Sequence, residues 1–255
     1  MDPLLNFSAK TILITGAASG FGRLLAQAFA ARGANLVLGD IDEAGLQETV
    51  ASLNIDDNRV VAMVNDVAKE SDCAALVEAA TSRFGALHYA INNAGIAHAP
   101  AAIHELTEAV FDKQMDVNVK GVMFGMKYQI PAMLKAGSGH ILNLSSMAGI
   151  GGAPKGGAYV AAKHAVAGLT RTAAIEYGRK NIQVNAVCPF FSPTNILNVD
   201  GFNTEQDRAR MAMGSPMKRL GEPQEMVNVM VLMLSPGNTY MNGQTIAIDG
   251  GVSAW

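Results

Sequence analysis

The sequence of 255 residues is poor in the residues that mark disulfide-rich, metal-binding or nucleic-acid-binding proteins. It has two cysteines, Cys73 and Cys188, which are too few for a disulfide framework and too far apart in sequence for a metal-binding pair, so we expect buried thiols in a reduced cytoplasm. Its five histidines form no His-x-x-x-His pair, so no metal site is predicted. The net charge is −3 and no basic cluster appears, which argues against nucleic acid as a partner.

Long apolar runs are also missing. Glycine and charged residues interrupt the apolar stretches before they reach the length that spans a bilayer. Residues 1–10 lack the basic start and the apolar stretch of a signal peptide, so we expect a cytoplasmic protein with no membrane partner. Apolar residues still make up 49% of the chain and charged residues only 16%, which is enough to build a large core.

Short aliphatic segments alternate along the chain with longer segments of helical periodicity. The strand segments are apolar almost throughout, which is typical of parallel strands covered by helices on both faces. We therefore predict an α/β fold: one doubly wound Rossmann-type domain over 1–255, with a parallel seven-stranded sheet and helices on both faces. The predicted strands are 11–15, 35–39, 60–64, 88–91, 140–144, 183–187 and 245–248, and the predicted helices are 21–32, 43–53, 70–84, 108–135, 158–179 and 223–234.

One long segment, residues 190–219, has no clear periodicity and contains prolines, glycines and methionines. A loop of this length inside a domain is usually functional. A disordered surface insertion is the alternative, but apolar residues are spaced through the segment and favour packing. We predict a substrate lid at about 190–219, with a short helix near 205–213.

A glycine-rich segment, Thr15-Gly-Ala-Ala-Ser-Gly-Phe-Gly22, joins the first predicted strand to the first predicted helix. Its glycines at 16, 20 and 22 let the backbone approach a pyrophosphate, and the helix that follows offers free N–H groups at its positive end. An ordinary tight turn is the alternative. The position between strand and helix favours a nucleotide site.

Asp40 ends the second predicted strand, where a carboxylate can bind both hydroxyls of an adenosine ribose and would repel a 2′-phosphate. Its neighbours Ser19 and Ile41 are not basic, so we predict NAD rather than NADP as the cofactor. Asp40 could instead cap the next helix, although Asp42 could fill that role. Asp66 follows the third predicted strand, where it could meet the adenine amino group or simply be an exposed loop acid.

Tyr159 and Lys163 lie four residues apart on a predicted helix and so share one face. A free tyrosine has a pKa near ~10, and a lysine cation or the pyridinium ring of an oxidised cofactor would lower it toward a useful value. A surface tyrosine packed on a lysine stem is the alternative. Ser146 ends the fifth predicted strand, at the sheet edge where α/β folds bind ligands, and could donate a hydrogen bond to a substrate oxygen.

Two segments place asparagine near this predicted site. Asn92-Asn93-Ala94-Gly95 follows the fourth predicted strand, where small residues let the backbone pass close to the cofactor and the asparagines can bind loop amides. Asn118 lies within the apolar helical segment 108–135 and needs a hydrogen-bond partner. Its side chain either forms its hydrogen bonds within the protein core or binds a water molecule beside Lys163.

In the order of these motifs, the sequence resembles the classical short-chain dehydrogenase/reductase (SDR) family over essentially its whole length. The motifs are Thr15–Gly22, Asn92–Gly95, Asn118, Ser146, Tyr159 and Lys163. The serine at 146 precedes Tyr159 by 13 residues, which fits the family and selects Ser146 over Ser145.

The resemblance implies a role for each motif residue. Tyr159 would be the acid/base, Lys163 would bind the nicotinamide ribose and lower the tyrosine pKa, and Ser146 would orient and polarise the substrate. Asn118 would hold a water in a proton relay, and Thr194 would meet the nicotinamide carboxamide. The predicted catalytic residues are thus Asn118, Ser146, Tyr159 and Lys163. The predicted cofactor-binding residues are Gly16, Ser19, Gly20, Phe21, Gly22, Asp40, Ile41, Asp66, Val67, Asn93, Ala94, Gly95, Tyr159, Lys163, Pro189, Ser192 and Thr194. The predicted substrate-binding residues are Ser146, Met147, Ala153, Tyr159, Phe190 and Phe191.

The resemblance also implies a homotetramer, or less often a homodimer, in which segments 108–135 and 158–179 pack between subunits and the tail 243–255 forms another interface. One position departs from the family. Where the family usually has Pro-Gly, this chain has Pro189-Phe190, which puts the nicotinamide contacts around Ser192 in question.

These observations predict an NAD-dependent oxidoreductase that interconverts a secondary alcohol and a ketone. Apolar residues around the catalytic motif and in the lid favour an alicyclic, aromatic or steroid-like substrate, unless they only pack the lid. A 3-oxoacyl-thioester reductase is the first alternative; it would normally use NADPH and carry a basic patch for an acidic carrier protein, and neither is indicated. An inactive nucleotide-binding regulator or scaffold is the second, and the presence of all four catalytic residues argues against it.

Overall fold

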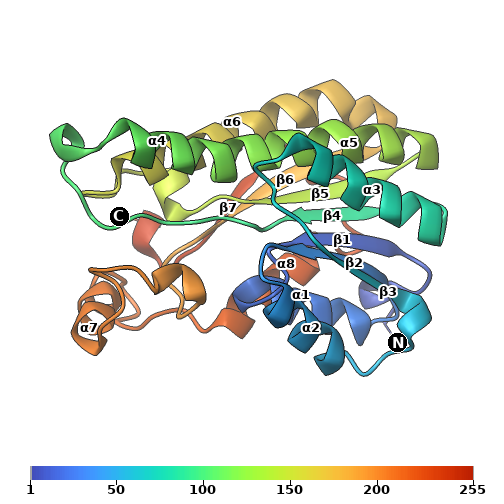
Figure 1. Cartoon of the computed structure of the whole chain (residues 1–255), viewed down its shortest axis with the longest axis horizontal. Coiled ribbons are helices and arrows are strands. Elements are labelled where there is room, and N and C mark those ends of the chain that lie inside the picture. The colour runs from blue at the N-terminus through green and yellow to red at the C-terminus, as the bar shows by residue number, and fades with distance from the viewer. Residues whose placement is uncertain (1, 255) are drawn as a thin grey trace.

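The computed structural model describes residues 2–254 and contains one sheet of seven parallel strands in the order β3-β2-β1-β4-β5-β6-β7 (Figure 1). Each step between neighbours in that order is a parallel pairing. The predicted parallel seven-stranded sheet is confirmed, with strand bounds within two residues of those predicted. The strands are β1 Thr11–Thr15, β2 Asn35–Asp40, β3 Val60–Val64, β4 Tyr89–Asn92, β5 Gly139–Leu144, β6 Ile182–Pro189 and β7 Thr245–Ile248.

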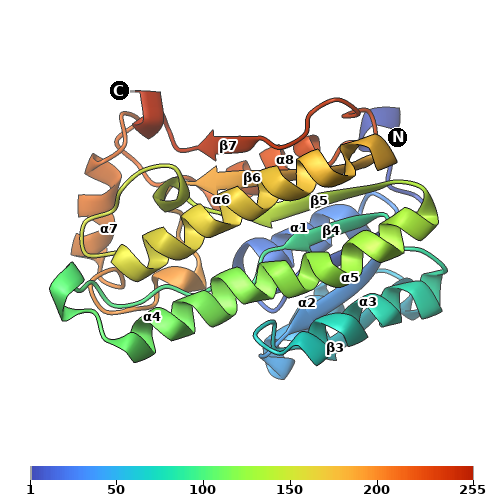
Figure 2. The ribbon, with the colours of Figure 1, turned by 90° about the horizontal axis from the view of Figure 1, so that it is seen from above.

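Helices cover both faces of this sheet, as predicted. Figure 1 shows α1, α2 and α8 below the sheet and α3, α4, α5 and α6 above it. Figure 2 shows α5 and α6 lying side by side on the outer surface of the upper layer. The helices are α1 Gly20–Ala30, α2 Glu43–Ser52, α3 Glu70–Phe84, α4 Glu108–Met115, α5 Gly121–Ala136, α6 Gly157–Tyr177, α7 Glu205–Met213 and α8 Pro223–Met233.

The two layers explain why the strands read as almost continuous apolar runs. In β1 all five residues are buried. Ile12 and Ile14 belong to the core that includes α1 and α8, whereas Leu13 belongs to the core that includes α3 and α5. Successive side chains of a strand point to opposite faces, so a sheet covered on both sides needs apolar residues at every position.

The predicted helix over 108–135 is interrupted in the structure. A π-helical turn, Asp116–Lys120, separates α4 from α5, and Gly121 donates its backbone N–H to the carbonyl of Asp116. Such a turn accommodates one extra residue in a helix and is frequent at functional sites. The apolar pattern continues through it, which is why periodicity predicted a single helix. Asn118 lies at the centre of the turn.

The lid segment, residues 190–219, contains the short helix predicted at 205–213, which is α7. Thr204 and Asp207 form a capping box at its start, because each side chain binds the backbone N–H of the other. Figures 1 and 2 show α7 beyond the carboxyl ends of the strands, close to the C-terminal end of the chain. Segment 190–219, predicted to be a lid, therefore lies at the edge of the sheet where a ligand site is expected.

Met1 and Trp255, the end residues of the predicted domain and of its predicted tail, lie outside the described residues. Among residues 2–254, no helix combines the length and the apolar character needed to cross a bilayer.

Candidate active site

A cavity of about 1010 Å³ lies at the carboxyl ends of the strands, where the loops after β1, β2, β3, β4, β5 and β6 meet the lid. Every residue predicted to bind cofactor or substrate lines it, with the single exception of Gly22. Of the four predicted catalytic residues, Ser146, Tyr159 and Lys163 line the cavity and Asn118 lies behind its wall. The structure thus brings motifs from across the chain to one site.

The glycine-rich turn after β1 is held in shape by the loop after β4. Asn93 donates from Nδ2 to the carbonyl oxygens of Thr15 at 2.8 Å and Gly16 at 3.0 Å. The Thr15 hydroxyl in turn accepts from the backbone N–H groups of Asn93 and Ala94, at 3.1 Å each. The Asn93 side chain thus binds peptide carbonyls of the glycine-rich turn, while the Thr15 hydroxyl satisfies the backbone N–H groups of the loop after β4.

Two glycines of this turn are required by its geometry. Gly16 has φ +68°, a left-handed conformation that glycine adopts without strain. A Cβ on Gly22 would collide with the carbonyl oxygen of Gly16, and Gly22 does not line the cavity. The glycines therefore keep side chains out of the bend, and α1 starts at Gly20, as a pyrophosphate site requires.

Asp40, the last residue of β2, points its carboxylate at this turn. Its Oδ2 accepts from the Ala18 N–H at 2.8 Å and its Oδ1 from the Asp42 N–H at 3.0 Å. The capping role goes to Asp42, whose side chain binds the Gly45 N–H at the start of α2. Asp40 is thus left at the cavity edge beside the glycine-rich turn, which is the position predicted for an adenosine ribose.

Two polar residues, Asn65 and Asp66, directly follow β3 and line the cavity. Asp66 accepts the Ala68 N–H at 3.0 Å and lines the cavity. Asn65 is 2% exposed, and neither polar atom of its side chain has a hydrogen-bond partner among the described residues. The sequence reasoning missed Asn65, although an amide directly after an apolar strand was a usable signal.

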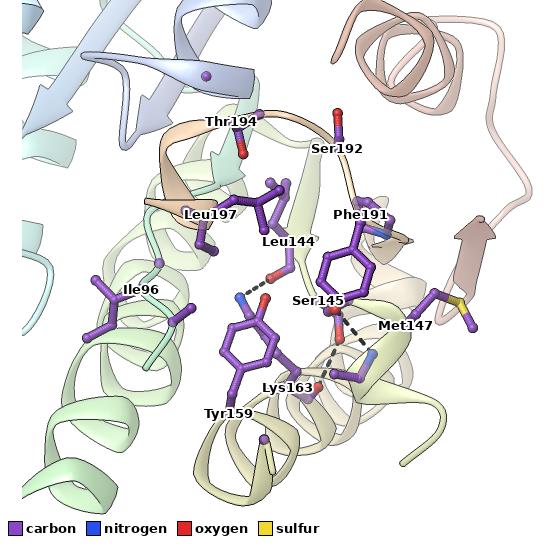
Figure 3. Close-up of a pocket in the computed structure, with 18 of the residues that line it drawn as sticks. Ile96, Leu144, Ser145, Met147, Tyr159, Lys163, Phe191, Ser192, Thr194 and Leu197 are labelled. Atoms are coloured by element: carbon purple, nitrogen blue, oxygen red, sulfur yellow. Dashed lines mark hydrogen bonds between the residues drawn. The ribbon is translucent and has the colours of Figure 1, made fainter. Parts of the chain in front are cut away.

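Two adjacent serines after β5 have different environments. Ser145 is buried and its hydroxyl donates to the carbonyl oxygen of Lys163 at 2.9 Å (Figure 3). Ser146 is partly exposed to the cavity, and its Oγ accepts from the Ala148 N–H at 3.1 Å, so its hydroxyl proton stays available. The geometry therefore supports the selection of Ser146 over Ser145 as the residue that faces a substrate.

Tyr159 and Lys163 lie on one face of α6, and both point into the cavity (Figure 3). The Lys163 Nζ is 5.5 Å from the centre of the Tyr159 ring and donates to the Leu144 carbonyl oxygen at 2.8 Å. Burial lowers the pKa of Lys163 to about 8. Burial also raises the pKa of Tyr159 to about 12, against an opposing effect of the Ser146 hydroxyl. The protein groups alone thus hold the phenol protonated.

Asn118 is fully buried, and its carboxamide is used by the protein. Its Oδ1 accepts from the Ile96 N–H at 3.0 Å, and its Nδ2 donates to the Ile96 carbonyl at 2.9 Å and to Gln114 Oε1 at 2.8 Å. It also stands near the lysine: a Cβ on Gly95 would lie 2.8 Å from Asn118 Oδ1 and 3.3 Å from Lys163 Nζ. The side chain therefore fixes the loop after β4 beside Lys163.

The lid side of the cavity begins at Pro189. Ser192 is 4% exposed, and its hydroxyl has no hydrogen-bond partner among residues 2–254. Thr194 packs close to Gly20, because a Cβ on Gly20 would lie 3.3 Å from the Thr194 Cβ. An unpartnered Ser192 hydroxyl in a residue that lines the cavity fits a polar ligand such as the carboxamide of a nicotinamide.

Phe190 stands where the family usually has glycine, and the structure accommodates it without backbone strain. Its φ is not in the left-handed region, and its N–H donates to the Ile248 carbonyl oxygen at 3.0 Å. Its ring packs edge-on against Phe191 at 4.8 Å between centroids and lies near Gly214 of the lid. The backbone of Phe190 thus joins segment 190–219 to β7, and its phenyl ring packs within that segment.

The rest of the cavity wall is mostly apolar. Met147 and Ala153 come from the segment between β5 and α6. Figure 3 shows Met147 and, from segment 190–219, Phe191 in this wall. The sequence reasoning missed several wall residues because they lie in loops without a motif: Ile96, Ala97, His98, Ile150, Leu197, Val199 and Phe202. Among residues 2–254, no group of three His, Cys, Asp or Glu side chains is arranged to hold a metal ion.

Comparison with known proteins agrees with this geometry. Residues 16–253 match the family model described as enoyl-(acyl carrier protein) reductase. Levodione reductase of Leifsonia aquatica is 37% identical over 260 residues, covering 99% of this chain and 97% of its own. Its crystal structure superposes with a TM-score of 0.92 over 98% of this chain and 99% of that chain.

Two further relatives also match over nearly the full length. Cyclohexanol dehydrogenase of Acinetobacter sp. (strain SE19) is 38% identical over 245 residues, covering 96% of this chain and 95% of its own. The crystal structure of a 3-ketoacyl-(acyl-carrier-protein) reductase from Brucella melitensis in complex with NADH has 33% identity and a TM-score of 0.90, covering 97% of this chain and all of that chain. The chain therefore belongs to the short-chain dehydrogenase/reductase family, and it is an oxidoreductase that acts on CH–OH groups with a nicotinamide cofactor.

Proposed function

We propose that this enzyme is an NAD-dependent dehydrogenase that interconverts an alicyclic secondary alcohol and its ketone, with Tyr159 as the acid/base. The observation that carries the proposal is that Tyr159, Ser146 and Lys163 share one cavity with the glycine-rich turn and Asp40. The levodione and cyclohexanol enzymes are similar to this chain over nearly their whole length and support a ring substrate. The apolar wall around the catalytic residues suits such a ring.

In this proposal one catalytic residue transfers the proton and another binds the substrate oxygen. A bound nicotinamide supplies the acceptor or donor of the hydride. Tyr159 takes the hydroxyl proton of the alcohol during oxidation and returns it during reduction. Ser146 donates a hydrogen bond to the same substrate oxygen and stabilises the charge that develops there. Lys163, with one N–H held by Leu144, offers its remaining N–H groups to the nicotinamide ribose.

Burial raises the pKa of Tyr159 and so favours its neutral phenol. A cation held beside the phenol, such as the ring of an oxidised nicotinamide, would favour the phenolate and make Tyr159 a better base. Asn118 supports the site from behind by fixing Ile96, and we propose that a water between Asn118 and Lys163 carries the proton onward.

A preference for NAD over NADP follows from the surroundings of Asp40. Its carboxylate would repel a 2′-phosphate. Arg23, the cation closest in sequence to the glycine-rich turn, is already engaged by Glu48 at 2.9 Å and by the Ala18 carbonyl at 2.6 Å. It is therefore not free to neutralise a phosphate at the ribose.

Three further proposals concern the organisation of the protein. We propose that residues 1–255 act as one catalytic domain in which segment 190–219 closes over the substrate. We propose a homotetramer built through α5 and α6, because these helices expose Met123 at 37% and Ile175 at 83%. We propose a cytoplasmic location, in which Cys73 and Cys188, both buried and free, stay reduced.

The test is the oxidation of cyclic alcohols, measured as the absorbance of reduced nicotinamide. We expect wild type to oxidise cyclohexanol-type substrates with NAD, and Tyr159→Phe to lower kcat by about 10²–10⁴-fold. Tyr177→Phe, at the far end of the same helix, is the matched control and should keep wild-type activity. Faster reduction of 3-oxoacyl thioesters than of cyclic ketones would replace the proposal with the thioester reductase. Equal inactivity of wild type and Tyr159→Phe on all of these substrates would point to a regulator or scaffold.

A further inference from the structure

Residues 93–102, which follow β4, contain one imidazole, that of His98, and the backbone is fixed on both sides of this residue. On one side, Asn118 binds both the N–H and the carbonyl of Ile96. On the other, Ala101 forms a parallel bridge with Gly156 and donates its N–H to the Lys155 carbonyl oxygen at 3.0 Å. The second anchor lies just before Tyr159 in the chain. His98 therefore lies between two fixed points of the backbone. One is Ile96, which Asn118 binds, and the other is Ala101, which pairs with Gly156 before Tyr159.

The two nitrogens of the His98 ring have different surroundings. Its Nδ1 lies 2.8 Å from the carbonyl oxygen of Ala99, which can only accept, so Nδ1 is the nitrogen assigned as the donor. In the tautomer with its hydrogen on Nδ1, Nε2 holds a lone pair and can accept a hydrogen bond. This atom is buried, and none of residues 2–254 gives it a hydrogen-bond partner. A buried acceptor without a donor is costly, so a ligand that supplies the donor gains affinity.

His98 is a polar residue in a part of the cavity wall that is otherwise apolar. It lines the same cavity as Tyr159 and Ser146, together with Ile96 and Ala97 from its own loop. The lid reaches the same loop, because a Cβ on Gly201 would lie 2.9 Å from the Pro100 Cγ. A substrate held between this loop and the lid would meet His98 at an atom other than its reacting carbon.

We propose that His98 determines substrate specificity by accepting a hydrogen bond from a second hydroxyl group, so that the preferred substrates are alicyclic diols or ring hydroxyketones rather than simple cyclic alcohols. This inference rests on the proposed function, because it assumes that a ring alcohol occupies the cavity. The inference adds a second hydroxyl group to the substrate, and the catalytic residues do not need this group for the reaction. A site built to bond a hydroxyl discriminates strongly against analogues without it, whereas an apolar pocket does not.

The experiment compares cyclohexane-1,4-diol with cyclohexanol on wild type, His98→Phe and His98→Gln, with NAD. Wild type should have the higher kcat/KM for the diol. His98→Phe keeps the ring shape without the acceptor and should lower the diol-to-cyclohexanol ratio of kcat/KM by about 10-fold, mainly through KM. His98→Gln, which places an amide near the position of Nε2, should restore part of the ratio. His104→Phe replaces an exposed imidazole outside the cavity wall and should leave the ratio unchanged.

Binding of the same two alcohols in the presence of NADH, measured by calorimetry, separates this inference from the proposed function. If no variant turns over either alcohol but the diol binds more tightly to wild type than to His98→Phe, the role of His98 stands and the proposed function fails. If wild type oxidises both alcohols and His98→Phe leaves the ratio and the binding unchanged, His98 has no such role. If neither alcohol binds or reacts, both ideas are overturned.

Discussion

Lys163 donates a hydrogen bond of 2.8 Å from Nζ to the carbonyl oxygen of Leu144, the last residue of β5. This bond ties the catalytic helix α6 to the edge of the sheet and holds the lysine 5.5 Å from the Tyr159 ring centre. The lysine is only 3% exposed, and burial lowers its pKa to about 8. The enzyme thus keeps a costly buried ammonium where the cofactor ribose and the tyrosine need it.

The buried lysine predicts a pH dependence of stability. The pKa of Lys163 is about 8 in the folded protein and 10.5 in a free side chain, so between these values the unfolded chain binds the extra proton. The free energy of unfolding therefore rises with pH across this window, relative to a variant that lacks the group. We expect wild type to gain on the order of 2–3 kcal/mol over Lys163→Met between about pH 8 and 10.5, measured by urea unfolding. A difference that does not change with pH would contradict the burial of a charged lysine.

The cofactor preference can be reversed at the end of β2. Asp40→Ser together with Ile41→Arg removes the repelling carboxylate and adds a cation for a 2′-phosphate. We expect the ratio of kcat/KM with NAD to that with NADP to fall by at least about 10-fold. The measurement is initial rates with both cofactors on one alcohol.

Asp42→Ala is the matched control for that change. It removes the cap of α2, where the Asp42 side chain binds the Gly45 N–H. It should lower the free energy of unfolding by about 1 kcal/mol and leave the cofactor ratio at its wild-type value. A wild-type enzyme that used NADP as well as NAD would show that Asp40 does not set the preference.

The sheet and most of the site could be predicted from the sequence because they depend on local patterns. Strands covered on both faces are mostly apolar, and in β1 all five residues are buried, with apolar residues at 12–14 between two threonines. The glycine-rich turn and the Tyr159–Lys163 pair depend on spacing within one segment. These features need no knowledge of distant contacts.

What the sequence did not reveal depends on contacts between distant segments. The sequence predicted that Asn93 binds loop amides but could not identify the loop, because its partners Thr15 and Gly16 lie almost eighty residues away. The π-helical turn around Asn118 leaves the apolar pattern unbroken, so periodicity cannot detect it. His98 has no motif, and its position depends on Asn118 and on the bridge at Ala101.

The two serines after β5 predict opposite effects of the same substitution. Ser146→Ala removes a donor to the substrate oxygen and should lower kcat by about 10²–10³-fold, with little change in Tm. Ser145→Ala removes the bond to the Lys163 carbonyl and should lower Tm, with a smaller effect on kcat. Steady-state kinetics and thermal unfolding monitored by circular dichroism measure the two effects. A larger loss of kcat in Ser145→Ala would mean that the serine roles are exchanged.

Apolar residues on the outer surface of α5 and α6 predict that subunits associate through these helices. Ile175 on α6 is 83% exposed, and Met123 on α5 and Phe111 on α4 add apolar surface in the same helical layer. A monomer gains nothing from exposing these side chains, whereas a subunit interface buries them. Ile175→Lys should convert a tetramer into smaller species, measured by light scattering after size-exclusion chromatography. Ala51→Lys, on α2 across the sheet, should leave the tetramer intact. A wild-type protein that elutes as a monomer, or an Ile175→Lys variant that stays tetrameric, would show that subunits do not associate through this surface.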